Sequence, residues 1–381
     1  MKFQVNRDVF SEAVSFAVRL LPQRTTQPIL SGILLEASEG ALVLSSFDYE
    51  VSSRTEIAAE VDEPGTALVS GRLLADIASR LPNAPVQFST DEGKIAVRCG
   101  SAKFTLLSMP VEEYPTLPQV DERTGVVPAE DFADAVAQVT VAASRDDVTP
   151  VITGVQLEVG DTSLSLVATD RYRVAVRDID WDGGASSSAG SVALIPARTL
   201  SEIGKTFAHS GTVGVSIVRS DDRELIAFSA DKRTVTSLLI KGNFPPVKRL
   251  FPEQVDNYAV LTTSELIESV RRVSLVLERE AALRFSFSLD GLTLEAAGSE
   301  QAQAQETIDA HLHGDDTVVS LKPSFLLDAL SAVHSEFVRV SFTKTENPNK
   351  PGPVLITSQS SKDQPGADNY KYLLQPNLLL R

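Results

Sequence analysis

Histidines and clustered charges are the first places to look for chemistry in this chain of 381 residues, which has four histidines and one cysteine. His311 and His313 stand two positions apart beside Asp315 and Asp316, a spacing found in metal sites. No third histidine or cysteine stands next to them, so the pattern is more typical of a strand end that runs into a charged turn. We therefore expect no metal and no cofactor.

The segment TDRYR, residues 169–173, sets an acid beside two arginines, which could form a phosphate site. An equivalent aspartate, Asp48, has tyrosine and glutamate beside it instead. The shared aspartate is therefore interpreted as a turn or strand-end residue. Nucleophile-elbow, phosphate-loop and dinucleotide-binding motifs are absent from the sequence, and we expect no catalytic residues.

Composition indicates an ordinary globular protein of two or three domains, with 43% hydrophobic and 23% charged residues. The single Cys99 excludes a disulfide framework and favours a reducing compartment. Polar residues from Asn6 to Glu12 interrupt any signal peptide, and no run of 18 apolar residues follows, so we expect a cytoplasmic protein without a membrane span. The formal net charge of -16, taken alone, argues against coating a nucleic acid.

The chain repeats itself. Residues 28–57 and 150–179 align without a gap, 122 positions apart, and share Pro28/Pro150, Gly32/Gly154, Leu35/Leu157, Glu36/Glu158, Leu42/Leu164, Leu44/Leu166, Asp48/Asp170 and Ile57/Ile179. A third, fainter pattern begins at Ala67, Ala193 and Val319, each 126 positions from the next, and passes from an apolar strand into a helix. Three units of about 125 residues account for the whole chain.

Within a unit, hydrophobic periodicity alternates between strands, such as residues 41–47 and 94–99, and helices, roughly residues 8–21 and 71–81. The order is strand, helix and three strands, twice in each unit, which predicts an α+β fold. Proline clusters at residues 113–125 and 243–257 mark linkers. The predicted domains are therefore residues 1–120, 126–252 and 257–381.

Basic residues recur on the predicted helices. Arg72 and Arg198 occupy equivalent positions, 126 apart, and Arg80, Lys205, Lys322, Arg271 and Arg272 also lie on helices. Helices that face one space would present a positive lining within an acidic molecule. Asp76, Glu202 and Glu268 lie on the same helices, so a solvated face of mixed charge is the alternative. The repetition favours the lining.

Segments along the whole chain resemble the bacterial sliding clamp family, the β subunit of DNA polymerase III, with features of its actinobacterial members. These are MKFQVNRD, PILSGILLE, SSFDYEVSSR, MPVEEYPTLP, VATDRYRVAV, GNFPPVKRLFP and the closing YLLQP. The resemblance implies three similar clamp domains in a head-to-tail homodimeric ring. Helices would line the hole around duplex DNA, and sheets would lie outside. The implied role is a non-catalytic processivity factor.

The resemblance also implies three sets of site residues. The DNA-binding set comprises Arg24, Arg72, Arg145 and Arg198, followed by Lys205, Arg271 and Arg272. The dimer interface joins Phe104 and Leu106 to Leu275 and Val276, with Arg98 and Lys103 expected to pair with Glu300 and Glu306. The pocket for short linear motifs of the polymerase catalytic subunit, the clamp loader and repair proteins comprises Ile152, Thr169, Arg171, Tyr172, Arg173, Val174, Pro245, Arg249, Leu250, Phe325, Leu373, Gln375, Pro376 and Asn377.

The end of the chain departs from the family pattern, because Gln375 precedes Pro376 where members commonly have methionine. A polar amide in place of an adaptable thioether should change how apolar anchors pack. This motivates an alternative function, a clamp paralogue whose modified pocket evades a clamp-targeting inhibitor. A β-rich hydrolase is a remote alternative from another class.

Overall fold

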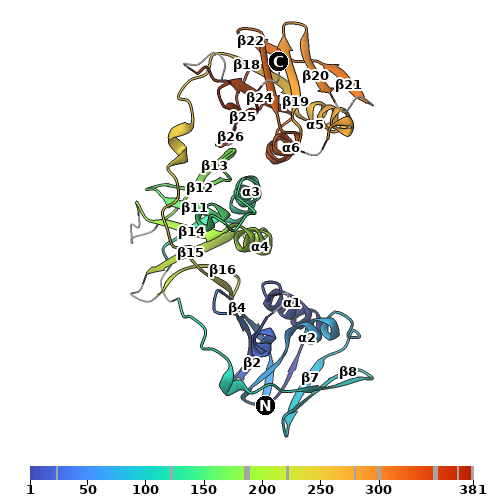
Figure 1. Cartoon of the computed structure of the whole chain (residues 1–381). Helices are drawn as coiled ribbons and strands as arrows, with labels where there is room; N and C mark the ends of the chain where they lie inside the picture. The colour runs from blue at the N-terminus through green and yellow to red at the C-terminus, as the bar shows by residue number, and fades with distance from the viewer. Residues whose placement is uncertain are drawn as a thin grey trace. The chain divides into compact units, whose positions relative to one another are not determined.

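The computed structural model describes residues 1–22, 25–120, 123–183, 189–219, 223–278, 280–297, 302–345, 351–366 and 369–378. Their elements follow one another along the chain as coloured in Figure 1. The chain splits into two compact units: Met1–Glu130 with Asp182–Ser188 and Ser201–Leu239, and Asp131–Trp181 with Ala189–Leu200 and Ile240–Arg381. No helix in these described ranges is long and apolar enough to cross a membrane.

The first compact unit is built on two sheets. Its strands and helix-forming segments are β1 (Lys2–Val5), α1 (Arg7–Val18), β2 (Gly32–Ser38), β3 (Ala41–Phe47), β4 (Val51–Ala58), β5 (Glu60–Glu63), β6 (Gly65–Ser70), α2 (Gly71–Ala78), β7 (Val86–Asp91), β8 (Lys94–Cys99), β9 (Ala102–Leu107), β10 (Gly125–Pro128), β15 (Thr212–Arg219), β16 (Glu224–Ala230) and β17 (Arg233–Leu238). Strand order is β5-β1-β7-β8-β9 in one sheet and β10-β15-β16-β17-β4-β3-β2-β6 in the other.

The second unit contains most of α3 (Ala129–Thr140) and the start of α4 (Ala197–Phe207). Its other elements are β11 (Gly154–Val159), β12 (Ser163–Thr169), β13 (Arg173–Asp180), β14 (Val192–Pro196), β18 (Tyr258–Thr262), α5 (Thr263–Val273), β19 (Leu283–Ser288), β20 (Gly291–Ala297), β21 (Gln303–Ile308), β22 (His311–His313), β23 (Thr317–Leu321), α6 (Pro323–Ala332), β24 (Phe337–Phe342), β25 (Val354–Gln359) and β26 (Tyr370–Leu374). The sheets run β14-β11-β12-β13-β26-β25-β24-β18-β22 and β21-β20-β19-β23.

The helices form where the sequence predicts them but end earlier. The side chain of Asn6 accepts hydrogen bonds from the backbone N–H groups of Asp8 and Val9, at 2.9 and 3.2 Å, and so caps the first turn of α1. Helix α1 then buries Phe10 and Val14 on one face. It stops at residue 18 instead of 21, and α2 at 78 instead of 81, because each approaches a proline, at positions 22 and 82, that cannot continue a helix.

The predicted order of strand, helix and three strands occurs twice in each third of the chain, with β5 and β22 as additional short strands. The two compact units differ from the three predicted domains, because the two sheets of the middle third belong to different units. The predicted boundaries stay a prediction. Strands β10, β15, β16 and β17 share a sheet with the first third, whereas β11 to β14 share one with the last third.

Each of the two largest sheets contains strands from two of the chain's three parts, and we call the pair of strands that joins the two parts a seam. Strand β4 pairs antiparallel with β17, and β13 pairs antiparallel with β26. Strands β4 and β13 each end the first strand–helix–three-strand set of their part of the chain. Strands β17 and β26 each end the second such set of the part that follows. Helices meet at the same places: the rings of Phe16 and Phe207 lie 6.4 Å apart between α1 and α4, and Gln138 of α3 donates to the carbonyl of Ala332 of α6 at 2.9 Å.

Candidate functional site

The turn between β12 and β13 carries the candidate site. Asp170 Oδ1 accepts hydrogen bonds from the backbone N–H groups of Tyr172 and Arg173, both at 3.1 Å. Asp48 makes the equivalent bonds to Glu50 and Val51 in the turn between β3 and β4. The prediction that the repeated aspartate is a turn residue is therefore confirmed, and the turn fixes the direction of the two arginines beside Asp170.

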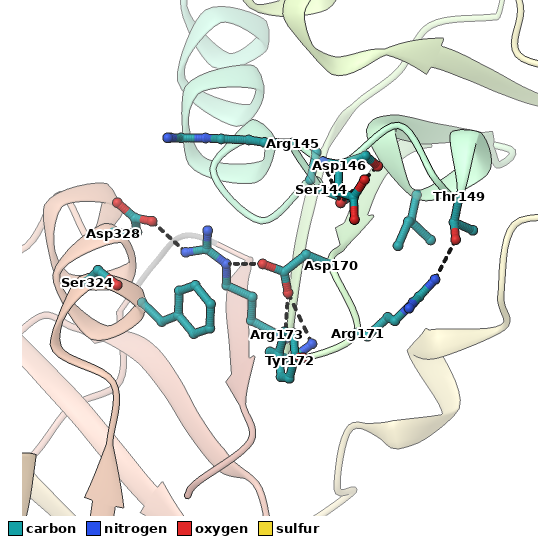
Figure 2. A pocket seen from close by; sticks show the side chains of 13 residues that line it. Ser144, Arg145, Asp146, Thr149, Asp170, Arg171, Tyr172, Arg173, Ser324 and Asp328 are labelled. Carbon is teal, nitrogen blue, oxygen red and sulfur yellow. Dashed lines mark hydrogen bonds and ion pairs between the residues drawn. The ribbon is translucent and has the colours of Figure 1, made fainter. Parts of the chain in front are cut away.

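Arg173 is the buried centre of the site, with 6% of its surface exposed. Its Nε donates to Asp170 Oδ2 at 2.9 Å, and its Nη1 donates to Asp328 Oδ2 at 2.5 Å and to the Tyr372 hydroxyl at 3.0 Å. The guanidinium also lies 4.3 Å from the centroid of the Phe325 ring. One arginine thereby links the β12–β13 turn, α6 and β26, as Figure 2 shows for the two carboxylates.

The electrostatics of this cluster keep Arg173 charged and Tyr372 neutral. Burial alone would lower the pKa of Arg173, but Tyr372, Asp328 and Asp170 outweigh it and raise the pKa above its ordinary value. Burial also raises the pKa of Tyr372, whose hydroxyl donates to the carbonyl of Phe325 at 2.8 Å. Arg173 and Tyr372 therefore keep these protonation states near neutral pH and form a fixed support.

A cavity of about 610 Å³ lies above this support (Figure 2). Apolar and aromatic walls come from Ile152, Phe325 and Tyr172, which is 62% exposed and stacks on Phe325 with ring centroids 6.1 Å apart. Polar groups at its edge are Ser144, Arg145, Asp146, Thr149, Asp170, Arg171, Arg173, Ser324 and Asp328. A concave apolar surface with a few oriented polar groups suits a ligand with apolar anchors.

A second apolar surface continues from the turn. Val174, Val247 and Leu373 are buried in one cluster, and Val174 and Leu373 are cross-strand partners in the seam between β13 and β26. Leu250, at the end of the short 3₁₀ helix Val247–Leu250, is exposed. The Gln375 backbone N–H donates to the Tyr172 carbonyl at 2.9 Å, which places the residue beside the turn with its side chain exposed.

The structure thus brings together Ile152, Arg171, Tyr172, Arg173 and Phe325 around the cavity. Thr169 lies beneath, where its hydroxyl donates to the Arg173 carbonyl. Val174 and Leu373 belong to the second surface, and Gln375 follows β26. The remaining predicted pocket residues are half-buried Pro245, exposed Arg249 and Leu250, buried Pro376, and Asn377, whose N–H donates to the Ser320 carbonyl.

Asp328 and Tyr372 are functional residues that the sequence reasoning missed. Asp328 is the only charged residue within the apolar helix PSFLLDALSA, residues 323–332, and a lone acid there signals a buried partner. Arg145 was assigned to the DNA-binding set, but its side chain lines the cavity. Its contact with DNA stays a prediction.

Three of the six other basic candidates, Lys205, Arg271 and Arg272, are paired with acids. Lys205 contacts Glu202 at 2.8 Å, and Arg271 contacts Glu268 at 2.8 Å, each three residues away on the same helix. The alternative of mixed-charge helix faces therefore describes these positions. Arg72 instead donates to the Pro22 carbonyl at 3.1 Å. Arg198 is exposed on α4, and Arg24 lies outside the described residues.

One expectation about the interface residues needs correction. Leu106 was expected at a subunit interface, but it is buried in the core of its own unit, because the inward face of β9 meets Ile95 there. Within the chain, Glu306 pairs with Arg272 at 2.5 Å, and its expected pairing with Arg98 or Lys103 of a second copy stays a prediction. This ion pair raises the pKa of Arg272 and lowers that of Glu306, and it also removes Arg272 as a free basic residue.

The other interface candidates are accessible. Phe104 and Leu275 are exposed, Val276 is half-buried, and Arg98 and Lys103 are exposed directly opposite each other on β8 and β9. Glu300 lies outside the described residues.

His311 and His313 form the short strand β22, and His313 stacks on Tyr258 with ring centroids 4.6 Å apart, so the strand-end interpretation is confirmed.

Comparisons with known proteins identify the family. The models of the N-terminal, central and C-terminal domains of the DNA polymerase III β subunit match residues 1–118, 126–246 and 248–363. The chain belongs to the DNA polymerase III β subunit family, the bacterial sliding clamps. The "Beta sliding clamp" of Streptomyces coelicolor is 47% identical over 99% of both chains, in accord with the predicted actinobacterial features.

Three further comparisons agree with this family. The "Beta sliding clamp homolog GriR" of Streptomyces muensis is 39% identical over 99% of both chains. A sliding clamp of Pseudomonas aeruginosa, solved bound to griselimycin, has a TM-score of 0.89 and 26% identity over 100% of both chains. The Bacillus subtilis sliding clamp structure matches equally, with a TM-score of 0.89 and 26% identity over 100% of both chains.

Proposed function

We propose that two copies of this chain close head to tail into a ring around duplex DNA. The observation that carries the proposal is the repeated seam. Strand β21 corresponds to β4 and β13 in the repeat, and β9 corresponds to β17 and β26. Both β21 and β9 lie at the end of their sheets. Pairing β21 of one copy with β9 of the other would complete a third seam of the same kind, with α5 beside α2.

Charge supports this third seam. Arg98 and Lys103 face each other as like charges across β8 and β9, which is unfavourable in an isolated sheet. A partner strand bearing acids would relieve that repulsion. Glu306 lies on β21, where its pair with Arg272 leaves it 25% exposed. Phe104 and Leu275 would supply apolar contact beneath the strands.

DNA binding by the ring is proposed to be weak and independent of sequence. Topology would retain the DNA, and arginines such as Arg72, Arg145 and Arg198 would only centre it. Non-specific binders have dissociation constants of about 10⁻⁴ to 10⁻⁶ M. The pairing of Lys205 and Arg271 with acids reduces the positive field further, which favours sliding over stopping.

The pocket is proposed to bind short linear motifs of the polymerase catalytic subunit, the clamp loader and repair proteins. Each apolar anchor would contribute about 1.5 to 3 kcal/mol on burial, and the ordering of the peptide would offset part of that gain. Micromolar affinity follows, which suits the exchange of partners. The chain would act in the cytoplasm as a non-catalytic processivity factor.

Retention on circular DNA tests the ring. The chain is loaded onto nicked circular DNA and washed at high salt, and the DNA is then cut once. We expect stable retention on circles and rapid loss after cutting. Equal loss from circular and linear DNA would refute topological binding.

A second candidate function is a clamp paralogue with an altered pocket. The exposed Gln375 beside the turn and the 39% identity to the GriR homologue favour it, whereas the 47% identity to an ordinary clamp favours the main proposal. Affinities for a partner peptide and for griselimycin should be compared with those of the Streptomyces coelicolor clamp. Equal affinities for both ligands would rule out the function as a paralogue with an altered pocket.

A further inference from the structure

Arg171 has an unusual backbone for its residue type. Its φ of 80° lies in the left-handed region, which suits glycine and is costly for a residue with a long side chain. Its counterpart in the repeat, Tyr49, has a φ of 73° in the equivalent turn. The turn itself therefore requires a left-handed residue at this position, and glycine would adopt it without strain.

The two side chains differ in what they contact. The Tyr49 ring packs on Phe47, with ring centroids 5.6 Å apart, so packing offsets part of its backbone strain. The Arg171 side chain is exposed at the edge of the cavity, where it donates one hydrogen bond to the Thr149 hydroxyl (Figure 2). A guanidinium has five N–H donors, so this bond leaves donors for a ligand.

The acids of the cavity do not neutralise Arg171. Asp170 and Asp328 both bind the guanidinium of Arg173, and Asp146 Oδ1 accepts from the Val148 N–H at 3.0 Å. The Arg171 side chain extends instead toward Thr149, away from the carboxylates of Asp170 and Asp328 (Figure 2). Its charge therefore lies at the edge of the cavity, where the carboxylate of a ligand could bind it through two parallel hydrogen bonds.

We infer that Arg171 selects partner peptides that carry an aspartate or glutamate side chain next to their apolar anchors. This inference rests on the proposed role of the cavity as a peptide pocket. Arg173 would hold the base of the cavity in place for every peptide. Arg171 would discriminate between peptides with and without an acidic side chain. An exposed ion pair is worth at most about 1 kcal/mol, or about fivefold in affinity.

Binding of matched peptides to the full chain tests the assignment. Fluorescent peptides contain a glutamine followed by aliphatic and aromatic anchors, which is the motif that the resemblance to sliding clamps implies. Each remaining position is in turn aspartate or asparagine. Amidated C-termini exclude the terminal carboxylate as the bound group. We expect aspartate to bind about fivefold tighter than asparagine at one or more positions, with the difference shrinking at high salt.

Arg171→Gly is the informative variant, because glycine keeps the turn and removes only the side chain. It should abolish the preference for aspartate, so that the aspartate and asparagine peptides bind this variant equally, and it should keep or raise the melting temperature. Tyr49→Gly is the matched control, with the same backbone change in the other turn, and should retain the preference. Equal binding of both peptides by the unaltered chain, or a preference that survives Arg171→Gly, would overturn the inference alone. Failure of every peptide to bind would overturn the proposed pocket as well.

Discussion

Arg171 and Arg173 stand two positions apart and have opposite environments. Arg173 is buried among Asp170, Asp328 and Tyr372, whereas Arg171 is exposed at the cavity edge. A buried charge without its partner is strongly unfavourable, but an exposed one is not. The same residue type should therefore control stability at one position and specificity at the other.

Replacing Arg173 by methionine should destabilise the protein by about 3 kcal/mol, because Asp170 and Asp328 lose their partner. Urea unfolding measures the change. Arg271→Met removes an exposed pair, Arg271 with Glu268, and should change stability by less than about 0.5 kcal/mol. Similar losses for both variants would contradict the assigned role of the buried cluster.

Gln375→Met should strengthen partner-peptide binding by about fourfold, since a thioether in place of the exposed amide buries apolar surface worth about one methylene. Fluorescence anisotropy with a single peptide measures it. Gln364→Met is the control, because Gln364 is exposed beyond Gln359, at the opposite end of β26 from Gln375. Unchanged or weaker binding by Gln375→Met would count against its place at the pocket.

At the scale of elements, local patterns predicted more than long-range pairing. The strands at residues 41–47 and 94–99 match β3 and β8, because alternation of apolar residues is a local signal. The seams between β4 and β17 and between β13 and β26 join segments far apart in sequence, which periodicity does not encode. The pocket residues could be predicted from the family resemblance. The pairing of Glu306 with Arg272 could not be predicted, because it depends on how β21 lies beside α5.

The segment after β9 is held to the sheet by Tyr114. Its hydroxyl accepts from the Phe47 N–H at 2.7 Å and donates to the Gly32 carbonyl at 3.3 Å. Tyr114→Phe should cost about 2 kcal/mol, because the N–H loses its acceptor. Urea unfolding measures the loss, and faster hydrogen exchange at Phe47 would locate it. Tyr49→Phe, at an exposed ring, should have little effect, and equal losses would contradict the assignment.

Tyr114 should also make stability depend on alkaline pH. Burial raises the pKa of Tyr114 to about 12, above the unfolded value of about 10. Its neutral form is therefore favoured in the folded state, so its contribution is complete below pH 10 and is lost as pH rises toward 12. The stability difference between the unaltered chain and Tyr114→Phe should shrink over that range. A constant difference would contradict it.

At the scale of the whole molecule, the end strands β9 and β21 can form the proposed third seam only if a second copy of the chain supplies the partner strand. The net charge of -16 opposes association of two chains in general, so the contact must be local and complementary. Strand edges supply hydrogen bonds for this contact, and exposed apolar side chains supply buried area. The proposed ring therefore depends on a small surface at each end of the series of domains.

Leu275→Glu should convert the dimer into monomers, as measured by sedimentation velocity. Leu275 is 84% exposed next to α5, where a charge would be buried in the proposed seam without a partner. Leu289→Glu is the control, at a residue that is 83% exposed in the turn between β19 and β20. If both variants sediment as the unaltered chain does, the seam does not use this surface.

The cross-strand pair Val174 and Leu373 limits which substitutions could make the proposed pocket resistant to a ligand. Both side chains belong to the apolar cluster of the site, and the same residues join the middle third and the last third of the chain within one sheet. A resistance mutation at either position would weaken binding and folding together. Selection should therefore favour changes at exposed positions such as Tyr172, Leu250 and Gln375, where altered recognition carries little structural penalty.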